Sequence, residues 1–437
     1  MKVVYLAAGA AGMICGSCLR DNRLAATLRA QGRDISLWPL YTPIRTDEVD
    51  VSRRRVYWGG IGAYLREKVR PLASLPGWMT RPLASPRLLS WLSRFAGSTR
   101  AEDLGALTVS MLKGEHGPQR AEVEPLVEAL KHERPDLVNL PDLMLLGVAG
   151  TLKRALGVPV VCTLSGEDVF VDALPQPWRT EALARIREAA AEVDAFIAVT
   201  RYCATHFIGH FALPADRVHV APLGVDTEVF APGPPPPASP KVISYLSRQC
   251  REKGLDLLVD AFERLAGSEP DVRLRIAGYC GPGDRVYARN LQERVRSIGL
   301  SSRVDWLGEI RLEEKVRLLQ SSHVFSVPSR YVETKGLPVL EAMSCGVPVV
   351  QPAHGSYLEL VEESGGGLTF PPGDVEALAA TFRRLIRDVE LRRRLADQGR
   401  AAVVRGWTHV RMAQRTWEIY EAVVCGEQPP DKGTSPG

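Results

Sequence analysis

Residues 327–374 read VPSRYVETKGLPVLEAMSCGVPVVQPAHGSYLELVEESGGGLTFPPGD, and the order of elements in this stretch decides the fold class. The apolar run HVFSVP, which ends inside it, predicts a buried strand. A loop carrying Glu333 follows, and Gly336 and Pro338 open a helix that ends near Gly346. The run VPVV predicts the next strand, and the turn HGS opens another helix. Alternating strands and helices of this kind predict a parallel sheet.

This order places two helix N-termini, at Gly336 and Gly355, on the same edge of the predicted sheet. The free N–H groups and the positive dipole end of such a helix suit a phosphate group. Glu333 and Glu341 are suited to accept hydrogen bonds from hydroxyl groups, although a solvated loop acid and an exposed helix acid also occur at this spacing. A ligand with a diphosphate between two polyols, such as a nucleotide sugar, fits both features.

Together with the segments PSR, GLPVLEAM, CGVPVV and PPGD, the stretch closely resembles the donor-site signature of retaining glycosyltransferases with the GT-B fold, of the large family 4 type. The resemblance implies that Glu333 contacts hydroxyls of the donor sugar and that Glu341 contacts the nucleotide ribose. It also implies that the turn between them meets the donor phosphates. The further donor-binding residues implied in and after this turn are Lys335, Gly336, Leu337 and Gly355.

The composition is that of an ordinary globular protein, with 45% hydrophobic and 24% charged residues in a chain of 437. This length exceeds what one hydrophobic core usually serves, so we expect two domains. A net charge of +4 is small for the length and argues against a dedicated nucleic-acid binder. The start MKVVYLAAGAAG predicts a strand and not a signal peptide, and the eight scattered cysteines fit a reducing compartment. We therefore expect a cytoplasmic protein without a membrane span.

A glycine-rich loop, GAAGMICGS, follows the first predicted strand and precedes a helix. In the resembled family this loop lies near the donor phosphate and the acceptor, and Gly12 and Gly16 would let the backbone approach a ligand closely. Cys15 and Cys18 in the same loop have three interpretations. They are ligands of a metal site for which no further ligands are evident, a redox pair at a helix N-terminus, or two small residues in a tight turn, which we favour.

Residues 41–133 are the least regular part of the sequence and predict an insert in the first domain. Such loops carry acceptor specificity or mobility. The basic and aromatic segment 57–95, with Trp78, Trp91 and Phe95, has two interpretations. It contacts the inner face of a membrane peripherally, or it packs its aromatic side chains onto the domain, which we favour.

The strand and helix order resumes after residue 134, and predicted strands end next to Asn139, Asp142 and Ser165. The resemblance places these three residues on the acceptor side. Many family members have histidines near the positions of Asn139 and Ser165, whereas this chain matches only the common aspartate, at Asp142. The departure concerns the usual sugar and acceptor contacts, and not the fold.

The proline-rich segment 231–240 is the clearest boundary in the chain, because it prevents helix and sheet pairing. After it a predicted strand, KVISYLS, leads to Arg248 and Lys253, which match the second signature of the family. There the two cations embrace the donor diphosphate and neutralise the charge on the leaving group. Arg248, Lys253 and Glu333 are therefore the predicted catalytic residues.

The predicted organisation is a first, acceptor-side domain at 1–230 and a nucleotide-sugar-binding domain at 241–406. In the second domain, Ile310 lies where the backbone of the family contacts the nucleobase. Residues 407–424 resemble the last helix of the family, which returns to the first domain, and 425–437 predict a disordered tail.

We expect an α/β protein of the GT-B type, with two Rossmann-like domains whose parallel sheets face an interdomain cleft. The predicted reaction moves a hexose from a nucleoside diphosphate sugar, for example a UDP-sugar, to an acceptor with retention of anomeric configuration. No Asp-x-Asp triplet occurs, so we expect no metal and no other cofactor. The acceptor (a saccharide, a lipid-linked or a small molecule), the exact donor and the oligomeric state stay open.

Two alternatives are a non-catalytic nucleotide-sugar-binding protein, which the missing histidines suggest, and a nucleotide-sugar epimerase on the same fold. Lys335 also has two interpretations, because the family often has an aromatic or apolar residue there. Lys335 binds an anionic group of the donor, or it is a surface lysine without a role in binding.

Overall fold

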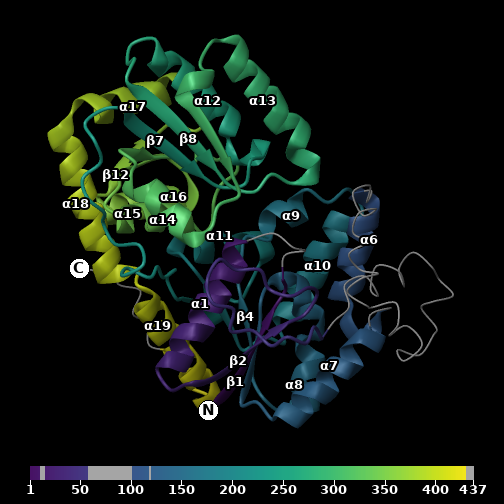
Figure 1. Ribbon diagram of the computed structural model, residues 1–437. Helices are drawn as coiled ribbons and strands as arrows, with labels where there is room; N and C mark the ends of the chain where they lie inside the picture. Colours follow the sequence, from purple (N-terminus) through teal and green to yellow (C-terminus); the bar gives the residue numbers. More distant parts are fainter. Residues whose placement is uncertain (10–14, 58–100, 118–119, 430–437) are drawn as a thin grey trace. The chain divides into compact units, whose positions relative to one another are not determined.

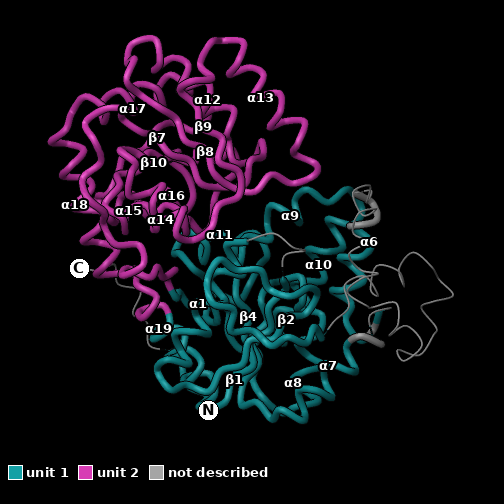
Figure 2. Tube along the Cα trace, viewed as in Figure 1, with its two compact units in different colours: residues 1–221, 413–432 teal, residues 222–412, 433–437 magenta. Residues whose placement is uncertain are grey.

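The computed structural model of the protein describes residues 1–9, 15–57, 101–117 and 120–429. The chain divides into two compact units, which are coloured separately in Figure 2. The first contains Met1–Ala221 and Ala413–Lys432, and the second contains Pro222–Met412. Each unit is built around a six-stranded sheet in which every strand pairing is parallel.

The sheet of the first unit has the strand order β2-β1-β3-β4-β5-β6. Its inner strands are short apolar runs that are buried on both faces, as expected for a parallel sheet covered by helices on both sides. The strands are β1 (Lys2–Ala7), β2 (Asp34–Pro39), β3 (Leu137–Leu140), β4 (Val160–Thr163), β5 (Ala195–Ala198) and β6 (Val218–Val220).

Helices connect the strands of the first unit, and Figure 1 shows their arrangement. The last helix of the chain begins at His409 and, from Ala413 onward, belongs to this unit. The described helices are α1 (Gly16–Ala30), α6 (Ala101–Leu112), α7 (Arg120–Glu133), α8 (Ala149–Leu156), α9 (Asp168–Asp172), α10 (Trp178–Ala190), α11 (Arg201–Phe211) and α19 (His409–Cys425), with 3-10 helices η3 (Gly114–His116), η4 (Leu143–Val148) and η5 (Ala215–Arg217).

The sheet of the second unit has the strand order β12-β11-β10-β7-β8-β9. The chain therefore builds outward from β7 in one direction and from β10 in the other, which makes the gap between these two strands a topological switch point. The strands are β7 (Lys241–Leu246), β8 (Val272–Ala277), β9 (Val304–Gly308), β10 (Val324–Phe325), β11 (Val349–Pro352) and β12 (Gly367–Phe370).

The helices of the second unit are strongly amphipathic where they cover the sheet. In α12 the leucines at 255, 257 and 258 are buried, and the helix packs against α17. The helices are α12 (Leu255–Ala266), α13 (Arg285–Ser297), α14 (Leu312–Gln320), α15 (Leu337–Ser344), α16 (Gly355–Ser364), α17 (Val375–Arg387) and α18 (Val389–Gly406), with 3-10 helices η6 (Arg251–Lys253), η7 (Pro282–Asp284) and η8 (Ser301–Arg303).

The proline-rich segment 231–240 lies within the second unit, where the Gln320 side chain donates a hydrogen bond to the Ala231 carbonyl at 2.8 Å. Across the described ranges, no helix is long and apolar enough to cross a membrane. The aromatic segment with Trp78, Trp91 and Phe95 and the end of the predicted tail, from residue 430, lie outside the described residues.

Candidate active site

Three loops of the second unit meet beyond the carboxyl ends of its central strands. A Cβ atom on Gly254, in the loop after β7, would lie 1.8 Å from the Pro328 carbonyl oxygen in the loop after β10. A Cβ atom on Gly355, after β11, would lie 2.4 Å from the Glu333 carbonyl oxygen. Both glycines have positive φ, at +67° and +58°, so sterics and backbone conformation both require glycine. The predicted donor residues are thereby brought to one edge, beside the switch point where α/β sheets bind ligands.

Lys253 and Glu333 form an ion pair inside this loop cluster. The ammonium Nζ of Lys253 lies 2.6 Å from Oε2 of Glu333, and the two side chains are only 13% and 6% exposed. The hydroxyl of Tyr331 donates to the same carboxylate oxygen at 2.9 Å and accepts a hydrogen bond from Lys253. The backbone N–H of Ser356, in the first turn of α16, donates to the Glu333 carbonyl at 2.8 Å and braces the loop.

The carboxylate of Glu333 is kept ionised by its neighbours. Burial raises its pKa, but the positive charges of Lys253 and Lys335 and the hydrogen bonds from Lys253 and Tyr331 outweigh burial and lower the pKa to about 2. The pKa of Lys253 is raised above its ordinary value because the attraction of Glu333 exceeds the cost of burial. At neutral pH the site therefore contains a fixed negative charge beside a fixed positive one.

Arg248 supplies a second cation at the end of β7. Its side chain is exposed, and in the part of the chain that the structure describes its guanidinium forms no ion pair. Burial lowers its pKa, yet nearby groups including Tyr331 and Asp284 raise it overall. The Tyr245 hydroxyl fixes the backbone by donating to the Arg248 carbonyl at 2.6 Å. An exposed guanidinium on a fixed backbone is available to an anionic ligand.

The helix α15 begins at Leu337, after the loop that carries Glu333, and the backbone N–H groups of Gly336 and Leu337 have no hydrogen-bond partner among the described residues. Gly336 precedes the helix with φ of +92°, and a Cβ atom there would lie 2.5 Å from a Leu360 methyl carbon. Leu337 is buried as the first helical residue, and Lys335 is half-buried with its backbone N–H 3.3 Å from Oε1 of Glu333. The predicted phosphate turn is thus a true helix N-terminus.

Glu341 lies on the buried side of α15. Its carboxylate is 2% exposed, and Oε1 lies 3.3 Å from Nζ of Lys315, which is 6% exposed. Lys315 also lies over the Phe230 ring, 5.3 Å from its centroid. Ile310, predicted to meet the nucleobase, is half-buried in the loop between β9 and α14.

In the first unit, the predicted acceptor residues Asp142 and Ser165 follow β3 and β4, whereas Asn139 lies within β3. Asp142 caps the 3-10 helix η4, accepting a hydrogen bond from the Met144 N–H at 3.0 Å. The Ser165 hydroxyl donates to the Pro141 carbonyl at 3.2 Å. Both loops are tied together by Glu167, whose two carboxylate oxygens accept from the N–H groups of Leu143 at 3.1 Å and Ser165 at 2.9 Å.

Asp142 and Glu167 form an acidic pair in the first unit, in which Glu167 is buried and Asp142 is half-buried. Burial and then the charge of Asp142 raise the pKa of Glu167 to about 7, against hydrogen bonds from backbone N–H groups. Burial, together with the charges of Asp21 and Cys15, raises the pKa of Asp142 to about 6. Within the described residues, neither carboxylate takes part in an ion pair. Both carboxyl groups therefore bind a proton more readily than ordinary carboxyl groups do.

Asn139 lies inside the core of the first unit and has no exposed surface. Its amide donates to Thr163 Oγ1 at 3.1 Å, and its carbonyl accepts from the Tyr420 hydroxyl of α19 at 3.1 Å. Arg20, Asp21 and Tyr5 continue this polar network. In this arrangement Asn139 joins the last helix of the chain to the sheet.

The glycine-rich loop is described only in part, and Gly12 lies outside the described residues. Gly16 begins α1, is exposed, and has no atom near the position of a Cβ. Cys15 and Cys18 are the N-cap and third residues of that helix, and neither is in a disulfide. Among the residues that could be searched, no group of histidine, cysteine and acidic side chains has the arrangement of a metal site.

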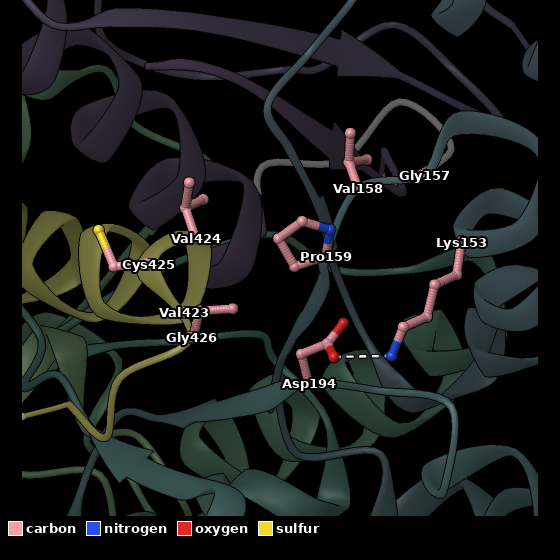
Figure 3. A pocket seen from close by; sticks show the side chains of 9 residues that line it. All are labelled: Lys153, Gly157, Val158, Pro159, Asp194, Val423, Val424, Cys425 and Gly426. Atoms are coloured by element: carbon pink, nitrogen blue, oxygen red, sulfur yellow. Dashed lines mark hydrogen bonds and ion pairs between the residues drawn. The ribbon is translucent and has the colours of Figure 1, made fainter.

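A pocket of the first unit lies away from these residues, at the amino ends of β4 and β5 (Figure 3). It is open and is crossed by the ion pair of Lys153 and Asp194, at 2.7 Å. The other lining residues are Gly157, Val158, Pro159, Val423, Val424, Cys425 and Gly426.

Two residues in these clusters were not predicted from the sequence. Tyr331 stands two positions before Glu333, and side chains at this spacing in an extended loop point the same way. Glu167 stands two positions after Ser165, beyond a strand end. Both spacings indicate side chains that lie near the predicted site residues. The hydrogen bonds that make Tyr331 and Glu167 important, however, depend on segments distant in the sequence.

Two family models match consecutive parts of the chain. The model described as Glycosyl transferases group 1 matches residues 226–402, and the model described as Glycosyltransferase Family 4 matches residues 106–229. The two matches cover most of the second unit and the later part of the first.

Characterised relatives are similar over most of their length. The D-inositol 3-phosphate glycosyltransferase of Pseudarthrobacter chlorophenolicus is 30% identical over 354 residues, covering 75% of this chain and 79% of the relative. The MMP alpha-(1->4)-mannosyltransferase of Mycolicibacterium hassiacum is 28% identical over 308 residues, covering 68% and 73%. The alpha-maltose-1-phosphate synthase of Mycolicibacterium smegmatis is 30% identical, covering 63% and 76%.

Solved structures share the fold over nearly the full length of the chain. The sucrose-phosphate synthase of Thermosynechococcus elongatus superposes with a TM-score of 0.72 at 20% identity, covering 98% of this chain and 100% of that one. HepE of Anabaena, in complex with UDP, gives 0.66 at 18% identity, covering 97% and 100%. The fold is therefore GT-B, and the chain belongs to glycosyltransferase family 4, the group 1 glycosyl transferases.

Proposed function

We propose that this glycosyltransferase moves a sugar from a nucleoside diphosphate sugar to an acceptor hydroxyl with retention of anomeric configuration. The observation that carries the proposal is the buried pair of Lys253 and Glu333, 2.6 Å apart, beside the exposed guanidinium of Arg248. To bind such a donor, a site needs cations for the diphosphate and a hydrogen-bond acceptor for the hydroxyl groups of the sugar. All three side chains belong to the carboxyl edge of one sheet.

In this proposal the two cations stabilise the charge that develops on the leaving diphosphate. Arg248 offers a planar guanidinium and Lys253 a point charge, and the N–H groups of α15 at Gly336 and Leu337 add their dipoles. Retention without a covalent intermediate follows if the leaving phosphate accepts the proton of the acceptor hydroxyl on the same face of the sugar. The protein then contributes position and charge, so no metal or other cofactor is required.

In the proposal, Oε1 of Glu333 accepts hydrogen bonds from hydroxyl groups of the donor sugar. Oε1 has only a long contact to the Lys335 N–H within the described residues, whereas Oε2 is bound by Lys253 and Tyr331. We assign Glu341 to the nucleotide ribose. Because Glu341 is paired with Lys315 and almost unexposed, this role requires the ribose to share the carboxylate with that lysine. Ile310 and Gly355 complete the proposed donor contacts, and Lys335 is placed to meet an anionic part of the donor.

On the acceptor side we assign Asp142 and Ser165, with Asn139 acting through the structure of the first unit. Glycines 12 and 16 belong to the proposed loop near the acceptor. The proposal gives residues 1–230 the acceptor role and 241–406 the donor role. A cytoplasmic location accords with the eight thiols, and the segment 57–95 is the proposed site of any peripheral membrane contact.

The nucleotide and the sugar are questions for experiment. A named relative, the phosphatidylinositol monomannoside mannosyltransferase of Mycolicibacterium smegmatis, is GDP-mannose-dependent, and HepE was solved with UDP. A panel containing UDP- and GDP-linked sugars therefore covers both kinds. The acceptor panel should contain a free saccharide, an inositol phosphate and a lipid-linked acceptor.

Thermal-shift and calorimetric titration of this panel, without added metal, test the proposal. We expect one nucleotide to bind and its sugar conjugate to be hydrolysed slowly, with release of the nucleoside diphosphate. Arg248→Ala should weaken binding of that diphosphate roughly 10- to 100-fold, because a hydrogen bond to a charged group is lost from an exposed side chain. Arg251→Ala, an exposed arginine of η6, is the matched control and should bind normally. Normal binding by the Arg248 variant would refute its role.

A further inference from the structure

The ammonium group of Lys253 is already engaged before any donor binds. Of its three N–H donors, one is directed to Glu333 Oε2 at 2.6 Å and another to the hydroxyl of Tyr331. Lys253 also lies over the Tyr331 ring, 4.6 Å from its centroid. With respect to the residues that the structure describes, the third N–H of the ammonium is left for a ligand, and its direction is fixed by the other two.

The hydroxyl of Tyr331 connects the cation and the carboxylate. It accepts a hydrogen bond from Lys253 and donates one to Glu333 Oε2 at 2.9 Å, so three groups close a small ring of hydrogen bonds. Burial, together with the charge of Glu333, raises the pKa of Tyr331 well above its ordinary value. The hydroxyl consequently remains protonated and acts as a donor over the whole working range of pH.

The backbone around Tyr331 is also fixed. The Arg330 guanidinium forms an ion pair with Asp256, and the backbone N–H of Arg330 donates to the Glu252 carbonyl at 2.9 Å. These contacts connect the loop after β10 to the segment that carries Lys253. The Tyr331 hydroxyl is thus carried by a loop with its own contacts, and its hydrogen bonds to Lys253 and Glu333 join two anchored segments.

We propose that Tyr331 is a positioning residue of the donor site, whose hydroxyl aims the ammonium of Lys253 at the donor diphosphate and leaves Oε1 of Glu333 for the sugar. Without the hydroxyl, the ammonium can rotate onto the carboxylate and use two N–H groups there. The inference rests on the proposed function, because it assigns the diphosphate and the sugar to this site.

The test compares Tyr331→Phe with the unaltered enzyme, using the nucleoside diphosphate and nucleotide sugar found in the panel. Phenylalanine retains the ring over Lys253 and loses only the hydroxyl. We expect affinity for the nucleoside diphosphate, measured by calorimetry, to fall roughly tenfold, and kcat/KM of donor hydrolysis to fall by at least as much. In a Lys253→Met background the same change should have little effect on affinity, because the hydroxyl acts through that ammonium.

Tyr57→Phe is the matched control. The Tyr57 hydroxyl accepts a hydrogen bond from the Arg53 guanidinium at 3.4 Å, in the first unit. It should bind the diphosphate normally even if its melting temperature falls. Normal affinity and hydrolysis in Tyr331→Phe would overturn the inference and leave the proposed function standing. The same conclusion would follow if Tyr331→Phe weakened diphosphate binding equally in the native and the Lys253→Met backgrounds. Failure of the unaltered protein to bind any nucleotide would overturn both.

Discussion

Glu333 in the second unit and Glu167 in the first are almost equally buried, at 5% and 7% exposure, and both follow the carboxyl end of a parallel strand. Their pKa values nevertheless move in opposite directions, to about 2 for Glu333 and about 7 for Glu167. Burial opposes ionisation in both. The difference lies in the neighbours, which are a lysine ammonium and a tyrosine hydroxyl for Glu333 and a second carboxylate, Asp142, for Glu167.

Of these two buried carboxylates, the one beside a cation and a hydrogen-bond donor is kept ionised, and the one beside a second carboxylate is not. Glu333 can present a permanent negative charge to a ligand because Lys253 offsets the cost of burial. The pKa values of Asp142 and Glu167 are instead raised, so these two carboxyl groups bind a proton at higher pH than ordinary carboxyl groups do. One edge is therefore built from fixed charges and the other from acids that titrate.

The two sites also contribute to stability in different ranges of pH. The folded-state pKa of Glu333 lies below its unfolded value, so its contribution is present above about pH 4 to 5 and is lost as pH falls towards 2. The folded-state pKa of Glu167 lies above its unfolded value. Its contribution is present below about pH 4 and is lost as pH rises through about 7.

Removing the cation should produce the largest effect. Lys253→Met leaves Glu333 buried without its partner, so we expect the free energy of unfolding at pH 7 to fall by about 3–5 kcal/mol, measured in urea. Donor hydrolysis should fall roughly 10²- to 10³-fold, because a cation on the leaving group is lost. The pKa of Glu333 should rise, which brings it closer to the behaviour of Glu167.

The control is Lys253→Met combined with Glu333→Gln. The double variant contains no buried unpaired charge, so it should recover a large part of the stability while remaining inactive. If it is as unstable as the single variant, the lost stability comes from the packing of the lysine chain and not from the ion pair.

Displacing the cation without changing any charge should have the next largest effect. In Gly254→Ala the new Cβ would lie 1.8 Å from the Pro328 carbonyl oxygen at φ of +67°. The loop that carries Lys253 must shift, so we expect a loss of about 3 kcal/mol or more in urea and weaker donor hydrolysis.

Gly299→Ala separates the effect of the positive φ from the effect of the contact with the Pro328 carbonyl. Gly299 has φ of +73° but no atom within 4 Å of its Cβ position. It should cost only about 1–2 kcal/mol, the price of the left-handed conformation, and leave hydrolysis unchanged. Equal losses for the two alanines would mean that backbone conformation, and not contact between the loops, makes Gly254 necessary.

The fold was accessible from the sequence because its signals are local. The strand, glycine turn and helix order around Glu333 predicted a parallel sheet, and the comparisons confirm the GT-B fold. The predicted donor residues Arg248, Lys253 and Glu333 come together at one edge, since parallel strands bring their carboxyl ends together. Their roles in catalysis stay predictions.

The ion pair itself could not be predicted. Lys253 and Glu333 are 80 positions apart, and their 2.6 Å contact depends on how closely Gly254 lets two loops approach. The enclosure of Asn139 was also unpredictable, because its partner Tyr420 comes from the last helix of the chain. The same holds for Glu167, whose raised pKa arises from a neighbour on another loop.

The smallest expected effect is a gain in stability in the first unit. Asp142→Asn retains the oxygen that accepts from the Met144 N–H, and asparagine caps a helix as well as aspartate does. It removes the charge that repels Glu167. We therefore expect the free energy of unfolding of the variant, measured in urea, to be about 1–2 kcal/mol higher than that of the native protein at pH 8. At pH 4.5 the difference should be much smaller, because Asp142 and Glu167 of the native protein are then mostly protonated.

Asp216→Asn, at an exposed acid of η5, is the control and should leave the pH dependence unaltered. The decisive quantity is the difference between the two pH values and not the stability at either. A loss of stability at pH 8 in Asp142→Asn would show that Asp142 stabilises its neighbours as an anion, as Glu333 does. The contrast between a titrating edge and a fixed-charge edge would then be wrong, and a cation outside the described residues would have to be sought for the first unit.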